Sequence, residues 1–261
     1  MKKFFMFMIV GLFAAVSAAC AKPKGEILRK QSPFSAIGVT GNLTVIYEQG
    51  NSYGVRIVGD ESLAKFVDTE VVGNTLELKN KTKKVAGVYT NAAGVDLSGL
   101  TLYVTAPDIS FFSLTGSGRM TIGKMTARNV SVYLTGSGSI VMSGISAGEA
   151  SINCVGAGSI TGTIQASNVA LTMTGVGAIK ADITKAASLI CSTTGLGSIN
   201  VSGNVGKYTK TMVGNGTIHD SALSYQSIAV STVGRNGGNG NQTNVDTTSR
   251  PRSANGIVAE P

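Results

Sequence analysis

The stretches FSLTGSGRMTI (residues 112–122) and VYLTGSGSIVM (residues 132–142) show nearly the same pattern of apolar, hydroxyl and glycine residues. Each centres on a Gly-x-Gly pair. The pair recurs at Gly116/Gly118, Gly136/Gly138, Gly156/Gly158, Gly175/Gly177, Gly195/Gly197 and Gly214/Gly216. The steps between first glycines are 20, 20, 19, 20 and 19 residues. A fixed period of this length is the signature of a repeat architecture.

Apolar residues alternate with small or polar ones on both sides of each glycine pair. Two residues after the second glycine, the chain is apolar in every repeat: Met120, Ile140, Ile160, Ile179, Ile199 and Ile218. Directly before the first glycine stand Thr115, Thr135, Val155, Thr174, Thr194 and Val213. This period of two predicts strands with one buried and one solvated face. Glycine suits the corner between strands because it adopts positive φ and has no side chain.

The repeats predict an all-β fold, a single-stranded parallel β-helix with about 20 residues per coil. The many glycines and the spacing of two oppose a helical repeat, and about 20 residues are too few for a propeller blade. Right-handed winding is favoured because parallel crossover connections nearly always have that hand. A seventh, degenerate turn is expected at Ile228, Val230, Thr232 and Gly234, since terminal repeats are atypical.

The rest of the chain divides by composition. A basic start, an apolar run and small residues predict a signal peptide at residues 1–19, followed by a tether at 20–33. Residues 34–234 are assigned to the β-helix domain, with irregular N-terminal coils at 34–105 and the Gly-x-Gly coils at 106–234. Asp60-Glu61-Ser62 marks a short helical turn between strands. Residues 235–261, rich in Asn, Gly, Thr and Ser, are expected to form a flexible tail.

Cys20 follows Ser17-Ala18-Ala19 and is the candidate lipid-attachment site of a bacterial lipobox, although Ser17 stands where Leu is typical. Ordinary signal-peptidase cleavage near Ala19 or Ala21 remains the alternative. Cys154 and Cys191 fall in different inward columns two coils apart, an offset of roughly 10 Å along the stack. A disulfide needs Cα atoms within about 7 Å, so both are expected to be buried free thiols.

The formal net charge of +8 is uneven, with Lys79, Lys81, Lys83 and Lys84 close together. Such a cluster can bind anionic lipid or polysaccharide, but it is more often part of a solvated loop. An exported protein without a binding motif is a poor candidate for nucleic acid. The sequence therefore predicts no nucleic-acid partner.

Catalytic and cofactor patterns are not visible in the repeats. The acids between Asp108 and Gly234 are Asp108, Glu149, Asp182 and Asp220, at different places in their repeats, so they suggest no carboxylate pair for glycoside cleavage. His219 is the only histidine, and it is expected to be a surface residue rather than a base or metal ligand. Strands follow the glycine pairs, which excludes a phosphate loop because that motif opens a helix. We expect no cofactor, no metal and no catalytic residue.

The chain resembles the family described as putative auto-transporter adhesin, head GIN domain. The resemblance rests on residues 34–39 (FSAIGV), residues 43–50 (LTVIYEQG), residues 71–78 (VVGNTLEL) and the Leu-Thr-Gly-Ser-Gly runs at 114–118 and 134–138. It covers about residues 30 to 234. It implies a β-helical fold in lipoproteins or secreted proteins of Gram-negative envelopes, and it supplies no ligand and no catalytic residues.

Three functions remain open. The first is a noncatalytic envelope protein that presents a β-helix face to a surface protein or glycan, as an adhesin or binding scaffold. It would be an outer-membrane lipoprotein held by its N-terminal lipid, or a periplasmic protein. The alternatives are a polysaccharide-active β-helix enzyme and a structural or assembly factor of the envelope. The aromatic residues whose positions bear most on this choice are Tyr53, Tyr89, Tyr103 and Phe111.

Overall fold

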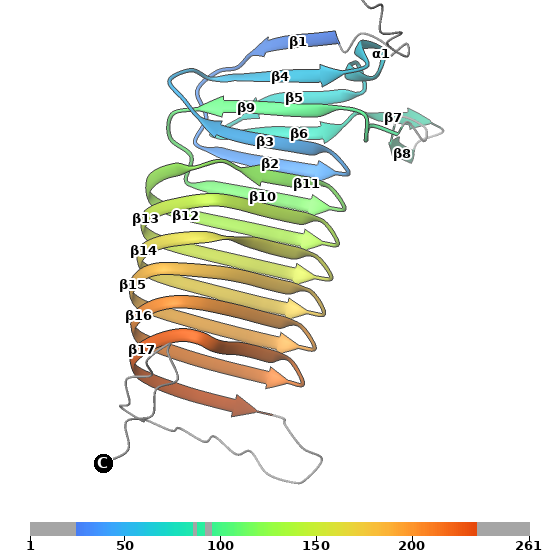
Figure 1. The fold of residues 1–261 in the computed structure, drawn as a ribbon. Coiled ribbons are helices and arrows are strands. Elements are labelled where there is room, and N and C mark those ends of the chain that lie inside the picture. The colour runs from blue at the N-terminus through green and yellow to red at the C-terminus, as the bar shows by residue number, and fades with distance from the viewer. Residues whose placement is uncertain (1–24, 86–87, 92–95, 234–261) are drawn as a thin grey trace, which may run out of the picture.

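The computed structural model describes residues 25–85, 88–91 and 96–233 (Figure 1). Its main body is a β-solenoid in which each coil pairs in parallel with the next. The strands of the coils are β10 (Phe111–Gly116), β11 (Arg119–Ile122), β12 (Met125–Gly136), β13 (Ser139–Gly156), β14 (Ser159–Gly175), β15 (Ala178–Gly195), β16 (Ser198–Gly214) and β17 (Thr217–Val233). The predicted β-helix of about 20 residues per coil is confirmed.

The register of the coils is the one expected from the glycine alignment. Gly136 pairs with Gly116 on one side and with Gly156 on the other, and Leu134 likewise pairs with Leu114 and Cys154. The alignment continues to the last coil, where Tyr208, Lys210 and Met212 pair with Ile228, Val230 and Thr232. Gly234, expected to end this seventh turn, lies outside the described residues.

The glycine corners are close-packed against each other. The first glycine of each pair has positive φ, for example 117° at Gly136, and a Cβ there would lie 2.6 Å from the carbonyl oxygen of Gly116. That same oxygen accepts a hydrogen bond of 2.9 Å from the amide of Gly138. Both the backbone conformation and the spacing between coils therefore require glycine.

Two flat faces meet at the line of corners. The segments before the corners form the pre-corner face, whose outward residues are Phe111, Ser113 and Thr115 of β10 and the residues aligned with them in the following coils. The segments after the corners form the post-corner face, which begins at Arg119 and Thr121 of β11. Figure 1 shows the pre-corner segments as stacked arrows that point to the corners.

One coil of the solenoid precedes the Gly-x-Gly repeats in sequence. It consists of β2 (Ala36–Gly41), which pairs in parallel with β10, and β3 (Thr44–Gln49), which pairs in parallel with β11. Gly41, with φ of 110°, aligns with Gly116, whereas Leu43 stands where later coils have the second glycine. This coil therefore lacks the glycine pair that marks the later coils in the sequence.

At the N-terminal end, one more strand on each side continues the stack in parallel, and antiparallel strands beyond them close it. On the pre-corner side, β6 (Thr75–Asn80) pairs with β2 and with β5 (Val67–Val72). On the post-corner side, β9 (Thr101–Ala106) pairs with β3 and with β4 (Gly54–Gly59), and β4 pairs with β1 (Gly25–Lys30). The short helix α1 (Glu61–Ala64) connects β4 to β5, and β7 (Thr82–Val85) and β8 (Val88–Asn91) form a separate hairpin.

The N-terminal region differs from its prediction in two ways. Within residues 34–105, expected as irregular coils, β2–β3 forms a regular coil and β6 and β9 extend the stack in parallel beyond it, whereas β5 and β4 add antiparallel pairs. Residues Gly25–Lys30, assigned to a tether, form β1, in which Ile27 packs against the core. The helical turn at Asp60-Glu61-Ser62 is confirmed, since the Asp60 carboxylate accepts the Ser62 amide at the start of α1.

The core is a continuous stack of aliphatic side chains along the solenoid axis. Cys154 and Cys191 lie in it as buried free thiols, as predicted. Burial raises the pKa of the Cys154 thiol to about 11 and that of Cys191 to about 12. Both side chains therefore remain neutral and act as small apolar groups at physiological pH.

Candidate functional site

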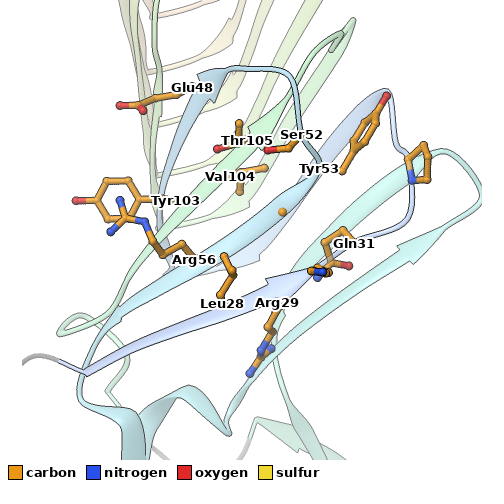
Figure 2. A pocket seen from close by; sticks show the side chains of 13 residues that line it. Leu28, Arg29, Gln31, Glu48, Ser52, Tyr53, Arg56, Tyr103, Val104 and Thr105 are labelled. Atoms are coloured by element: carbon orange, nitrogen blue, oxygen red, sulfur yellow. The ribbon is translucent and has the colours of Figure 1, made fainter.

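A groove of about 610 Å³ lies on the post-corner side at the N-terminal end. Strands β1, β4 and β9 form its floor, and the end of β3 with the following turn forms one rim (Figure 2). Its lining is Leu28, Arg29, Lys30, Gln31, Pro33, Glu48, Ser52, Tyr53, Gly54, Arg56, Tyr103, Val104 and Thr105. The volume falls within the range of small-molecule binding sites, about 300–1,000 Å³.

Arg56 and Tyr103 build one end of the groove. They are cross-strand neighbours on β4 and β9, which places the guanidinium carbon of Arg56 4.1 Å from the centre of the Tyr103 ring. The same guanidinium lies 3.6 Å from a carboxylate oxygen of Glu26 on β1. Stacking on one side and an ion pair on the other hold Arg56 in place, while 41% of its side chain stays exposed. This end therefore offers a fixed planar cation beside an aromatic ring.

Tyr53 lies at the opposite end of the groove (Figure 2). Its ring packs edge-on against buried Phe34, with 5.3 Å between ring centres. Between the two ends lies Leu28, which is 68% exposed. The groove thus has aromatic groups at both ends and an apolar middle.

Arg29 belongs to the scaffold of the groove rather than to its binding surface. Its Nη1 donates hydrogen bonds of 3.0 Å to the Val67 carbonyl oxygen and to Thr69 Oγ1, and its Nη2 donates one of 2.9 Å to the Ala64 carbonyl oxygen. Figure 2 shows its guanidinium directed away from the groove. These bonds join β1 to β5 and α1, so they hold in place the strand that carries Leu28.

The groove offers groups that can bind a ligand. Its lining contains one carboxylate, Glu48, whereas the common mechanisms of glycoside hydrolysis use two. Among the described residues, no group of three or more His, Cys, Asp or Glu could hold a metal ion. Glu48 and Ser52 are exposed at the rim. Aromatic faces with hydroxyl, carboxylate and guanidinium groups around them suit a ligand with both apolar and hydrogen-bonding surfaces.

The structure separates the residues that the sequence singled out. Tyr53 and Tyr103 line the groove, while Phe111 lies on the pre-corner face against Tyr133, with 5.3 Å between ring centres. Tyr89 belongs to β8, in a part whose side chains are not described. His219 is exposed on the post-corner side of β17, as predicted.

Two further predictions have different outcomes. Lys79 forms an ion pair of 2.9 Å with Glu77 on β6, so this member of the lysine cluster is already paired. Cys20 and the signal peptide at residues 1–19 lie outside the described residues, as does the tail at 235–261. Where the structure describes the chain, no helix has the length and apolar character needed to cross a bilayer.

A polar cluster inside the last coils is a second group of titratable side chains. Asp220 Oδ2 accepts hydrogen bonds from Lys210 Nζ at 3.0 Å and from the Tyr208 hydroxyl at 3.1 Å. Lys210 Nζ also donates to the Ile218 carbonyl oxygen at 3.1 Å. Burial raises the pKa of Tyr208. Because Lys210 occupies a core column near the open end of the stack, this cluster is a structural element rather than a site.

A glycine-cornered solenoid with antiparallel strands at its N-terminal end and an open groove beside them defines a β-solenoid protein built for surface recognition. The model of one family matches residues 33–163 of this chain, which is half of its length. The chain belongs to this family, described as "Putative auto-transporter adhesin, head GIN domain". A comparison with curated proteins found no match.

Solved structures of bacterial proteins share the fold. A "putative adhesin" from Bacteroides fragilis is 22% identical with a TM-score of 0.58, over 81% of this chain and 97% of that one. Another from Parabacteroides merdae is 16% identical with a TM-score of 0.62, over 81% and 92%. A "putative lipid binding protein" from Parabacteroides distasonis is 21% identical with a TM-score of 0.51, over 76% and 96%. At these identities the likeness shows the fold alone.

Proposed function

We propose that this protein is a noncatalytic, exported binding protein of adhesin type, which captures a cell-surface glycan or protein in the Arg56–Tyr103 groove. The observation that carries the proposal is the groove itself, with its stacked Arg56–Tyr103 pair and the distant Tyr53. Family membership supports an adhesin-like role. A rigid solenoid suits this role because its strands hold recognition groups in fixed positions.

The groove favours a glycan as the ligand to test first. The apolar face of a sugar ring packs well on an aromatic ring such as Tyr103, while sugar hydroxyls can bond to Glu48, Ser52 and Arg56. A guanidinium also pairs with a carboxylate in two-point fashion, so acidic sugars are included. A peptide could use the same apolar middle, and the experiment distinguishes the two ligand classes.

Binding to glycan arrays and to proteins from envelope extracts tests the proposed function. We expect Tyr103→Ala and Arg56→Ala to weaken binding at least about tenfold, since each removes a rigid anchor from the stacked pair at one end of the groove. Arg119→Ala, on the same face but outside the groove, is the matched control and should bind as the wild type does. Equal binding by all three variants would place recognition elsewhere, and no binding above background by the wild type would refute the proposal.

We also propose that the chain is anchored in the cell envelope through a lipid on Cys20, which would hold the groove near the membrane surface. The support is the sequence of small residues before this cysteine. Metabolic labelling with a fatty acid is expected to label the wild type and to leave Cys20→Ala unlabelled. Equal labelling of the two proteins, or of neither, would show that Cys20 is not the attachment site.

A further inference from the structure

The pre-corner face carries no charged side chain over most of its length. From β2 to β17, the outward residues of the three columns before the corners and of the corner position itself are Ala36, Gly38, Thr40, Phe111, Ser113, Thr115, Ser117, Ser131, Tyr133, Thr135, Ser137, Ser151, Asn153, Val155, Ala157, Ala170, Thr172, Thr174, Val176, Ile190, Ser192, Thr194, Leu196, Thr209, Thr211, Val213, Asn215, Ala229, Ser231 and Val233. The column at the far edge of the face holds Asn129, Glu149, Asn168, Ser188, Lys207 and Ser227, so the two charges of the face lie at this edge. We propose that this face is the interface of a homodimer, formed with the same face of a second copy of the chain.

Large apolar side chains are concentrated on the same face. Seven are exposed there or at its corner edge: Phe111, Tyr133, Val155, Ile190 and Val213 on the face itself, and Val176 and Leu196 at the middle of the glycine pairs, with exposed fractions between 37% for Phe111 and 65% for Leu196. The post-corner side of the Gly-x-Gly coils has only Val141 in this class among the described residues. An apolar surface that continues over stacked strands is typical of an interface rather than of a solvated sheet.

The missing charges are specific to this face. The post-corner face of the same coils carries Arg119, Lys180, Asp182 and His219, and the returns between coils carry Lys124, Arg128 and Lys185, whereas the pre-corner strands have Glu149 and Lys207 only in their edge column. Composition alone therefore does not explain an uncharged surface. A charged side chain buried without a partner costs several kcal/mol, so a face that is covered by another surface would lack such residues.

A second copy fits this face better than a charged partner does. An identical uncharged face brings no ion that would need a counter-ion, and its Ser and Thr hydroxyls both donate and accept hydrogen bonds. Two-fold packing of one patch on itself is the commonest arrangement of soluble oligomers. Flat sheets pack face to face at about 10 Å with side chains interdigitated, which suits the Val and Thr columns.

The size of the face agrees with a stable dimer. Strands about 4.8 Å apart and residues about 3.3 Å apart give the face from β2 to β17 roughly 34 Å by 20 Å, or about 700 Å². Standard interfaces bury about 800 Å² on each partner. Beyond β2 the face ends at the charged pair Glu77–Lys79 of β6, and Asp68 and Glu70 follow on β5. A polar rim around an apolar centre is the usual anatomy of an interface.

This arrangement leaves both grooves accessible. The groove lies on the post-corner side, which faces away from the proposed interface in each copy. A dimer would therefore present two Arg56–Tyr103 grooves, one on each outer side. Binding to a multivalent surface would then gain from avidity, whereas binding of a single free ligand would be unchanged.

Sedimentation of the purified protein at micromolar concentrations tests the dimer, with Val155→Lys as the disrupting variant. Val155 and Val141 lie on the same strand, β13, and each is 43% exposed, but they lie on opposite faces. We expect a dimer for the wild type and for Val141→Lys. For Val155→Lys we expect a dimer dissociation constant at least about tenfold higher, which shifts the protein towards monomer. Leu196→Glu, 65% exposed at the corner edge of this face, should also give monomer.

The proposal has clear contrary outcomes. A monomeric wild type at 100 micromolar, or a Val155→Lys protein that dimerises as the wild type does, would overturn it. If Val155→Lys does not fold by circular dichroism, Leu196→Glu decides the question. Because the groove lies on the other face, failure of the dimer would leave the glycan-binding test unaffected.

Discussion

Replacing Gly175 with alanine is expected to lower the stability of the solenoid by about 3 kcal/mol or more. Gly175 has φ of 115°, a region that residues with a side chain rarely adopt, which costs of order 1–3 kcal/mol. Its added Cβ would also lie 2.5 Å from the Gly156 carbonyl oxygen and 3.1 Å from the Gly156 nitrogen. Those atoms are backbone of the neighbouring coil, so no side-chain rotation can relieve the contact.

The measurement is thermal unfolding followed by circular dichroism. For a domain of this size a loss of 3 kcal/mol lowers the unfolding midpoint by roughly 10 °C. Gly144→Ala is the matched control because the nearest atom to its Cβ is a side-chain carbon of Lys124 at 3.5 Å, and its φ is not positive. That variant should be as stable as the wild type or slightly more stable. Equal midpoints for Gly175→Ala and Gly144→Ala would show that the corners tolerate a side chain.

The repeat explains why so much of the fold could be predicted. In a solenoid each residue type recurs at the position that the geometry requires, so six copies of one pattern reveal which positions point inward. The pairing of Leu134 with Leu114 and Cys154 follows from aligning glycines alone. The N-terminal strands have no such copies. Alternation at Val55 and Ile57 looks the same in parallel and antiparallel pairs, so their direction could not be read.

The groove could not be predicted from the sequence, for a related reason. Arg56 and Tyr103 are far apart in the chain and become neighbours only through the antiparallel pairing of β4 with β9. Tyr53 and Tyr103 were identified as residues to locate, but nothing in the sequence placed them around one cavity with Leu28. For the pre-corner face, in contrast, the repeat columns show small and hydroxyl residues, from which a solvated face was predicted. Its apolar members Val176 and Leu196 sit at the middle position of the glycine pairs, where no alternation marks them.

The second large effect is expected at the C-terminal end, where Asp220→Ala should destabilise the last coils by about 2 kcal/mol. The substitution removes the carboxylate that accepts from both Lys210 and Tyr208. Lys210 then keeps only the Ile218 carbonyl oxygen as a partner, with 15% of its side chain exposed. A poorly solvated ammonium without a counter-ion is costly, and the partial exposure of this pair keeps the loss below that of a fully buried one.

Amide hydrogen exchange can locate this loss. Each coil contacts mainly its neighbours, so protection should fall in β16 and β17 and remain unchanged in β12 and β13 of the same molecule. Uniform loss along the stack, or none, would contradict a local role for Asp220.

Lys210→Met removes the charge of Lys210 but keeps a side chain of similar length in the core, so it tests the ion pair separately from the packing. Methionine continues an inward column that holds Leu171 and Cys191 in preceding coils, and Asp220, 22% exposed, keeps the Tyr208 hydroxyl as a donor. We therefore expect Lys210→Met to cost less than about 1 kcal/mol, and Asp220→Ala to be milder when combined with it. If the double variant instead loses the sum of both effects, the pair is not coupled. Coupling would mean that a single ion pair stabilises the open end of the apolar stack, where the core columns are exposed to water. The polar atoms of this pair bond to each other and so need no further partners.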